Sequence, residues 1–170
     1  YYKADKSKFD ESWWYRTEFA LEKLTNNKHV VLNFDGISYR ANIWLNGQLV
    51  AAQDQVTGSF RRFEFDATSC AKLGKNVLAV EVFRQREGDF GLGFVDWNPR
   101  PLDENMGIWR DVTVSVLQKV QLKHAFVRSR VNTETLDEAW LTVGTELKNF
   151  DSKPISGKLV FTLNGVTVSK

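Results

Sequence analysis

The chain has 170 residues, of which 42% are hydrophobic and 26% are charged, and its formal net charge is +2. This is the composition of a folded globular protein and not of a disordered one. The net charge is too small and the basic residues too dispersed for a nucleic-acid partner, and no apolar run reaches the roughly 18 residues of a membrane helix, so we expect neither nucleic acid nor a membrane as a partner.

Apolar and polar residues alternate with a period of two, which predicts β-strands. The expected strands are residues 13–21, 29–34, 39–45, 60–65, 76–83 and 109–117. Asn46-Gly47 lies between two such runs and is a strong signal for a β-hairpin, whereas only residues 67–73 could form a helical turn. Many short strands with almost no helix predict an all-β fold, a two-sheet antiparallel sandwich of the jelly-roll type.

Some side chains can be assigned within these strands. Alternation along 39–45 predicts that one of two sets faces the core, either Tyr39, Ala41, Ile43 and Leu45 or their opposite-facing neighbours. Four tryptophans are expected to pack in the core or on a sheet face: Trp13, Trp14, Trp44 and Trp109. Arg110 is expected to form an ion pair with Asp111 or Glu18.

A second series of strand-like segments begins after Leu117. Residues 120–131, 139–150 and 156–170 predict three or four longer strands, and FTLNGVTV repeats the Asn-Gly hairpin chemistry. An immunoglobulin-like sandwich needs about seven strands and ~100 residues, and only about 50 residues follow Gln118. We therefore predict two domains, a complete sandwich at 1–118 and a truncated one at 119–170.

Cysteine and histidine are too sparse for the usual metal sites. Cys70 is the only cysteine, which excludes an intrachain disulfide and a cysteine-based metal site. His29 and His124 lie in separate strand-like segments, and no aspartate-rich loop has the ligand spacing of a calcium site. We expect no metal and no cofactor. The opening YYKADKSKFD shows no signal-peptide pattern, as in a mature protein or an excised piece.

Five blocks in consistent order resemble the amino-terminal sugar-binding domain of glycoside hydrolase family 2: WWYRTEF, FDGISYRANIWLNGQLV, GSFRRFEFDAT, GKNVLAVEV and GIWRDV. The family includes β-galactosidases, β-glucuronidases, β-mannosidases and exo-β-glucosaminidases. The resemblance implies a jelly-roll (galactose-binding-like) domain at 1–118 and the start of an immunoglobulin-like domain at 119–170. In the family a catalytic (β/α)8 barrel follows, and that barrel is the partner expected here. The resemblance also implies a periplasmic or extracellular location.

A long polar segment, FVDWNPRPLDENMGIWRDV at 94–112, interrupts the strand pattern. It is too long for a loop that only reverses the chain, which needs about two to five residues. In the family this loop can reach the barrel and line the pocket for the terminal sugar. The loop sequence most resembles that of the exo-β-glucosaminidase branch. β-Mannosidases carry Asp-Trp-Gly-Pro, and here Asn98 replaces the glycine, which argues against mannoside specificity.

The residue types in this loop suit a sugar. A tryptophan can stack on the apolar face of a pyranose, while a carboxylate or an amide binds its hydroxyls. Trp97 lies between Asp96 and Asn98, and Pro99 and Pro101 stiffen the loop. The substrate-binding residues we predict are Asp96, Trp97, Asn98, Asp103 and Glu104, whose carboxylates would favour an aminosugar. In the alternative interpretation, Asp96 and Asn98 cap a turn, Trp97 covers the sandwich end and residues 103–105 are a solvated tip.

Retaining glycosidases need two carboxyls about 5 Å apart, and in the family both lie on the barrel, so we assign no catalytic residue. The leading hypothesis is a non-catalytic N-terminal fragment of a retaining, exo-acting β-glycosidase that helps form the subsite for a terminal β-linked sugar. A stand-alone carbohydrate-binding module and a purely structural sandwich are the two alternatives.

Overall fold

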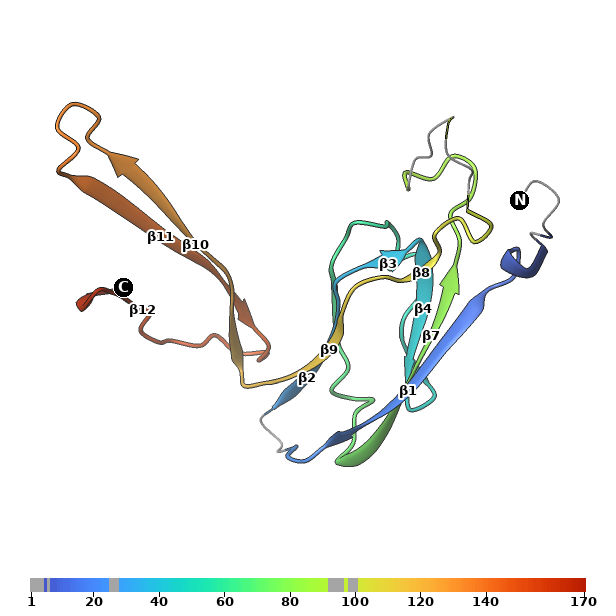
Figure 1. Cartoon of the computed structure of the whole chain (residues 1–170). Coiled ribbons are helices and arrows are strands. Elements are labelled where there is room, and N and C mark those ends of the chain that lie inside the picture. Colours follow the sequence, from blue (N-terminus) through green and yellow to red (C-terminus); the bar gives the residue numbers. More distant parts are fainter. Residues whose placement is uncertain (1–4, 6, 25–27, 92–96, 98–100) are drawn as a thin grey trace. The chain divides into compact units, whose positions relative to one another are not determined.

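The computed structural model describes residue 5, residues 7–24 and 28–91, residue 97 and residues 101–170. The chain divides into two compact units, Tyr1–Val116 and Leu117–Lys170 (Figure 1). Strands dominate the described residues, whose only helical element is the one-turn 3-10 helix η1 (Ser7–Phe9). The predicted all-β class is therefore confirmed.

The first unit is a sandwich of two sheets. One sheet has the antiparallel order β1-β7-β4-β5, with the bounds Trp13–Leu21, Gly74–Phe83, Arg40–Leu45 and Gln48–Ala51. The other has the order β6-β2-β9, with the bounds Phe63–Asp66, His29–Phe34 and Val112–Leu117. The short antiparallel pair of β3 (Ile37–Ser38) and β8 (Gly107–Ile108) lies at one end of this unit (Figure 1).

Alternation along β4 decides which side chains enter the core. Ala41, Ile43 and Leu45 are fully buried, and Tyr39 just before the strand is 5% exposed, so the first of the two predicted sets is the buried one. Val80 of β7 and Phe34 of β2 pack in the same cluster, which joins the two sheets. Burying each such large side chain contributes roughly 1.5–3 kcal/mol.

The tryptophans lie outside this core. Trp14 and Trp44 stack with ring centroids 5.0 Å apart on the outer face of the first sheet, over β7 between their strands. Trp13 stacks on Phe9 at 5.4 Å. Of the two predicted locations, the sheet face is therefore the one that Trp14 and Trp44 occupy.

Both Asn-Gly hairpins form as predicted. Asn46-Gly47 joins β4 to β5 with φ angles of 53° and 82°. Asn164-Gly165 joins β12 (Val160–Leu163) to β13 (Val166–Ser169) with φ angles of 46° and 81°. Two positive φ angles are typical of the type I′ turn, whose twist matches that of the flanking strands.

The second unit consists of two antiparallel hairpins. One pairs β10 (Val120–Val131) with β11 (Ala139–Asn149), and the other is the β12–β13 hairpin. Between them, an apolar hollow is lined by side chains that include Val127, Leu141 and Phe161. The assignment of this unit to an immunoglobulin-like sandwich stays a prediction.

Several details differ from the sequence prediction. The strand expected at 60–65 begins only at Phe63, because the residues before it form a turn in which the Arg61 N–H bonds to the Gly58 carbonyl at 3.4 Å. The strand expected at 109–117 is broken, since β8 ends before Trp109 and β9 begins after Asp111. Glu18, one of the two ion-pair partners expected for Arg110, pairs instead with Arg16 and Lys75, at 2.7 and 2.6 Å, and the pair with Asp111 stays a prediction.

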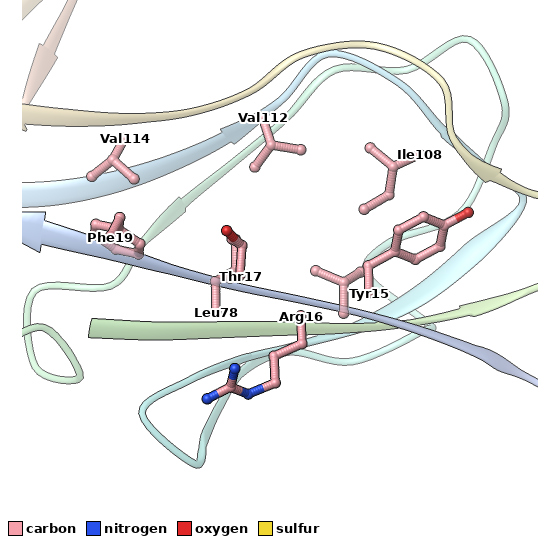
Figure 2. Close-up of a pocket in the computed structure, with 9 residues that line it drawn as sticks. Tyr15, Arg16, Thr17, Phe19, Leu78, Ile108, Val112 and Val114 are labelled. Carbon is pink, nitrogen blue, oxygen red and sulfur yellow. The ribbon is translucent and has the colours of Figure 1, made fainter. Parts of the chain in front are cut away.

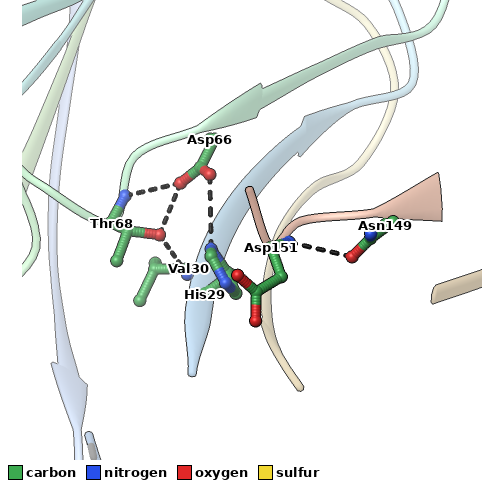
Figure 3. A network of polar contacts seen from close by, with 6 residues as sticks. All are labelled: His29, Val30, Asp66, Thr68, Asn149 and Asp151. Carbon is green, nitrogen blue, oxygen red and sulfur yellow. Dashed lines mark hydrogen bonds and ion pairs between the residues drawn. The ribbon is translucent and has the colours of Figure 1, made fainter. Parts of the chain in front are cut away.

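A small polar network ties the start of β2 to the chain that follows β6 (Figure 3). The Thr68 hydroxyl accepts a hydrogen bond from the Val30 N–H at 2.9 Å, and Asp66 accepts one from the Thr68 N–H at 2.9 Å. His29 Nδ1 lies 3.5 Å from the Asp66 carboxylate. Burial by itself would raise the pKa of Asp66, but the hydrogen bonds from Thr68 and the contact with His29 together lower the pKa.

One buried asparagine joins the β4–β5 turn to the segment before β7. Asn76 is fully buried, and its Oδ1 accepts from the Lys72 N–H at 2.9 Å and from Asn46 Nδ2 at 2.8 Å. Its Nδ2 donates to the carbonyls of Lys72 and Gly74, at 2.8 and 2.9 Å. An unpaired buried amide would be costly, and here each end of the amide has two partners.

We predict that Asn76→Leu lowers the free energy of unfolding by about 2–4 kcal/mol, although leucine is apolar and the position is buried. The substitution leaves the Lys72 N–H and the carbonyls of Lys72 and Gly74 without this partner. Urea unfolding followed by circular dichroism measures the change.

The matched control is Asn33→Leu. Asn33 of β2 is only half buried, and its amide donates to the Ser115 hydroxyl at 3.0 Å. Its loss should cost less than about 1 kcal/mol. Equal losses for the two variants would contradict the role assigned to Asn76.

Candidate functional site

The connection between β7 and β8 carries all five predicted substrate-binding residues. Its described parts extend from the end of the first unit at which β3 and β8 lie (Figure 1). Asp96 and Asn98 are outside the described residues. Trp97 is described and is 86% exposed. An indole this exposed covers little of the sandwich end, which disfavours the interpretation of Trp97 as a cover.

The first leg of this loop is fixed by an ion pair. Arg40, the first residue of β4, donates to both carboxylate oxygens of Asp89, with Nη1 2.6 Å from Oδ2. The Asp89 carboxylate also accepts the Arg86 N–H at 2.6 Å. The hydrogen bonds from Arg40 hold the pKa of Asp89 below its ordinary value of 3.8, so this pairing is lost only as pH falls through that lowered pKa.

Tyr39 forms the floor under this leg. The Arg40 guanidinium lies 4.8 Å from the centroid of the Tyr39 ring. On the loop side, Gly91 donates its N–H to the Asp89 carbonyl at 3.0 Å. A Cβ at Gly91 would overlap the Gln85 side-chain oxygen and come within 3.2 Å of the Tyr39 ring. The loop backbone therefore lies directly against Tyr39 at this point.

The second leg is a tight turn that contains the other two predicted carboxylates. The Asp103 carboxylate accepts the Asn105 N–H at 3.0 Å, and the Asp103 carbonyl accepts the Met106 N–H at 2.9 Å. Asp103 thus caps a turn, as the alternative interpretation proposed for neighbouring residues. Glu104 is only 8% exposed and has a φ angle of 54°, so it is not part of a solvated tip.

An aromatic shelf lies beside β8. Trp109 donates its indole N–H to the Ser59 carbonyl at 2.9 Å, and its ring lies against the backbone of Gly36. Phe60 meets it edge-on at 5.8 Å and is 70% exposed, and the Arg110 guanidinium lies 4.5 Å from the Trp109 ring centroid. Phe60 was expected in a strand at 60–65, but it precedes β6 and packs against Trp109 instead.

A separate hollow of about 520 Å³ opens between the two sheets (Figure 2). Its lining residues come from β1, β7, β8 and β9: Tyr15, Arg16, Thr17, Phe19, Leu78, Val80, Ile108, Val112 and Val114. Aliphatic and aromatic side chains dominate this set, and it includes no carboxylate or amide. Such a lining suits apolar contact and is poor in the groups that orient a sugar.

Two other classes of site can be addressed for the described part of the chain. There, no group of three or more histidine, cysteine, aspartate or glutamate side chains is placed to hold a metal ion. Nor does any helix in that part have the length and apolar character needed to cross a bilayer.

The β3–β8 end therefore presents an exposed indole on a loop held at both legs, and the same loop carries carboxylates.

This chain is similar to several known proteins. The model of the family described as "glycosyl hydrolase 2 galactose-binding domain-like" matches residues 3–89. The exo-β-D-glucosaminidase of Amycolatopsis orientalis is 33% identical over 96% of this chain, and that of Hypocrea jecorina is 32% identical over 95%.

The likeness extends to the fold. The crystal structure of the Amycolatopsis orientalis exo-chitosanase CsxA matches 99% of this chain with a TM-score of 0.89 and 32% identity. The chain spans only 16% and 18% of the lengths of the two glucosaminidases and 20% of the CsxA chain. With its all-β sandwich and the family match over residues 3–89, the chain belongs to the galactose-binding-like domain family of glycosyl hydrolase 2.

Proposed function

We propose that the chain is the non-catalytic N-terminal part of an exo-acting β-glycosidase, in which the β7–β8 loop helps form the subsite for a terminal β-linked aminosugar. The relatives that support this are named exo-β-D-glucosaminidases, and each aligns with at least 95% of this chain. The catalytic carboxylate pair would be supplied by a barrel elsewhere in the full-length protein.

The observation that carries the proposal is Trp97, an indole 86% exposed on a loop whose two legs are fixed. An aromatic side chain this exposed loses contact with water when a pyranose face stacks on it, which favours binding. Stacking on a loop that is already held also costs less conformational entropy than stacking on a free one.

The carboxylates of the loop give the proposed preference for an aminosugar. Asp96 and Asn98 flank Trp97 in the sequence, and a carboxylate and an amide are the groups that bind the ammonium and the hydroxyls of an aminosugar. Asp103 uses one carboxylate oxygen in its turn, through Oδ1, and retains Oδ2 for a second contact. Glu104 is buried in the same turn and would add negative charge where an ammonium is desolvated.

We predict that the 170-residue chain alone does not hydrolyse chromogenic β-glucosaminides. Hydrolysis with retention needs a pair of carboxyls about 5 Å apart on either side of the scissile bond. The measurement is release of nitrophenol by the purified chain, with the full-length protein as positive control. Turnover that co-purifies with the chain through several columns would refute the non-catalytic assignment.

We predict that Trp97→Ala and Asp96→Ala in the full-length enzyme each lower kcat/KM for a glucosaminide about ten- to a hundred-fold. For Asp96→Ala, losing a charge-assisted contact in a partly desolvated pocket typically costs ~1.5–3 kcal/mol, and for Trp97→Ala, losing the burial of a large aromatic side chain costs about as much. The melting temperature should change little, since an exposed loop side chain contributes under ~1 kcal/mol to folding.

The matched control is Trp14→Ala, which removes another exposed tryptophan, 58% exposed, from the outer face of the first sheet. Its kcat/KM should stay within about twofold of the parent. If Trp97→Ala behaves like Trp14→Ala in the kinetic assay, the loop does not contact the sugar and the sandwich has a structural role.

A further inference from the structure

The ion pair at the first leg of the loop is unlike the surface pairs of the same unit. The side chains of Arg40 and Asp89 are 19% and 13% exposed, whereas those of Arg16 and Glu18 are 60% and 38% exposed. Arg40 uses two guanidinium nitrogens on two carboxylate oxygens, a geometry that fixes orientation as well as distance. An exposed pair contributes about 0–1 kcal/mol, while breaking a desolvated one leaves a charge without its partner.

The Asp89 carboxylate is not available to bind a sugar. Its carboxylate already accepts two hydrogen bonds from Arg40 and one from the Arg86 N–H. The backbone of Asp89 also forms two hydrogen bonds. Its N–H donates to the Arg86 carbonyl at 3.1 Å, and its carbonyl accepts the Gly91 N–H at 3.0 Å. Side chain and backbone together hold residues 86–91 as one turn.

We propose that Arg40 and Asp89, with Tyr39 beneath them, form a loop clamp that positions the β7–β8 loop for the terminal sugar. This inference rests on the proposed function of that loop. The clamp holds Gly91 against Tyr39, and Trp97 follows six residues later. On the other side, a turn begins at Pro101, four residues beyond Trp97, and leads into β8, which pairs with β3.

The number of residues between the clamp and Trp97 limits how far the indole can lie from Gly91. A fully extended chain spans about 3.3–3.6 Å per residue, so Trp97 lies within roughly 20 Å of Gly91 and roughly 14 Å of Pro101. While Gly91 and Pro101 are both held, the Trp97 indole can occupy only positions within reach of both residues. Releasing the first leg removes one of the two limits, and the sugar must then order the loop as it binds. Arg40 and Asp89 would thus act on the sugar only through the loop.

The experiment uses the full-length enzyme with the variants Asp89→Asn, Arg40→Met and Arg40→Lys. Glu18→Gln is the matched control, because it also neutralises a carboxylate paired with arginine, on the outer face of the first sheet. Two readouts are taken for each variant. Hydrogen exchange of peptides covering residues 84–106 reports on the loop without substrate, and kcat and KM are measured with a chromogenic glucosaminide.

We expect Asp89→Asn and Arg40→Met to speed exchange in the 84–106 peptides and to lower kcat/KM about ten- to a hundred-fold, mainly through a higher KM. Arg40→Lys should fall between Arg40→Met and the parent, because lysine keeps the charge and loses the two-pronged geometry. Glu18→Gln should match the parent in both readouts. A role in stability alone would lower the melting temperature without raising KM.

Two results overturn the inference and separate it from the proposed function. Unchanged exchange in Asp89→Asn and Arg40→Met shows that the pair does not hold the loop. Faster exchange with unchanged kcat/KM, while Trp97→Ala still lowers kcat/KM, shows that the loop binds sugar without needing the clamp. If Trp97→Ala is also without effect, the proposed subsite itself fails.

Discussion

The strict alternation of β4 is the constraint on which the rest of the first unit depends. Ala41, Ile43 and Leu45 are buried between the sheets, and this burial fixes the register of β4 against β7 and β5. A shift of one residue would turn Arg40 and Asn42 inward and the aliphatic set outward, at a cost of several buried side chains. The hydrophobic core therefore decides where the polar residues at the two ends of β4 lie.

Those two ends have different polar chemistry. At the end of β4, partly buried Asn46 and fully buried Asn76 bond to each other and to the surrounding backbone with neutral hydrogen bonds. At its start, Arg40 reaches across to Asp89 in a charged and less buried contact. Neutral, satisfied amides are well suited to a permanent junction, whereas the charged pair lies nearer the surface and holds the start of the β7–β8 loop. One strand thus links the fold to the candidate site.

Much of this architecture could be predicted from the sequence because its signals are local. Period-two alternation and the Asn-Gly turns gave the strands 13–21, 29–34 and 120–131 with the bounds observed. The break at Trp109 could not be read in this way, because it depends on the indole bonding to Ser59, 50 residues away. The same holds for Arg40 and Asp89, which are 49 residues apart and belong to no common motif.

The candidate site was predictable only in part. The chemistry of sugars suggested Trp97 and its neighbours, and their role in binding sugar stays a prediction. The contacts at the two ends of the loop join residues far apart in the sequence, so composition does not reveal them. Arg110 illustrates the limit: its charge suggested a carboxylate partner, but long exposed side chains have many available contacts, and here the guanidinium lies over Trp109. Aspartate commonly caps turns in this way, and here the Asn105 N–H occupies Oδ1 of Asp103, which leaves Oδ2 of that carboxylate for a ligand.

Gly36 shows how such a long-range contact constrains a single position. A Cβ built there would lie 2.7 Å from two atoms of the Trp109 ring, closer than atoms can approach without moving. The ring cannot simply withdraw, since its N–H is bonded to the Ser59 carbonyl. Glycine is thus required here by the aromatic plane that covers it and not by its own backbone angles. Any larger residue at position 36 would have to displace the Trp109 ring, so the packing of the aromatic shelf depends on the absence of a side chain at this one position.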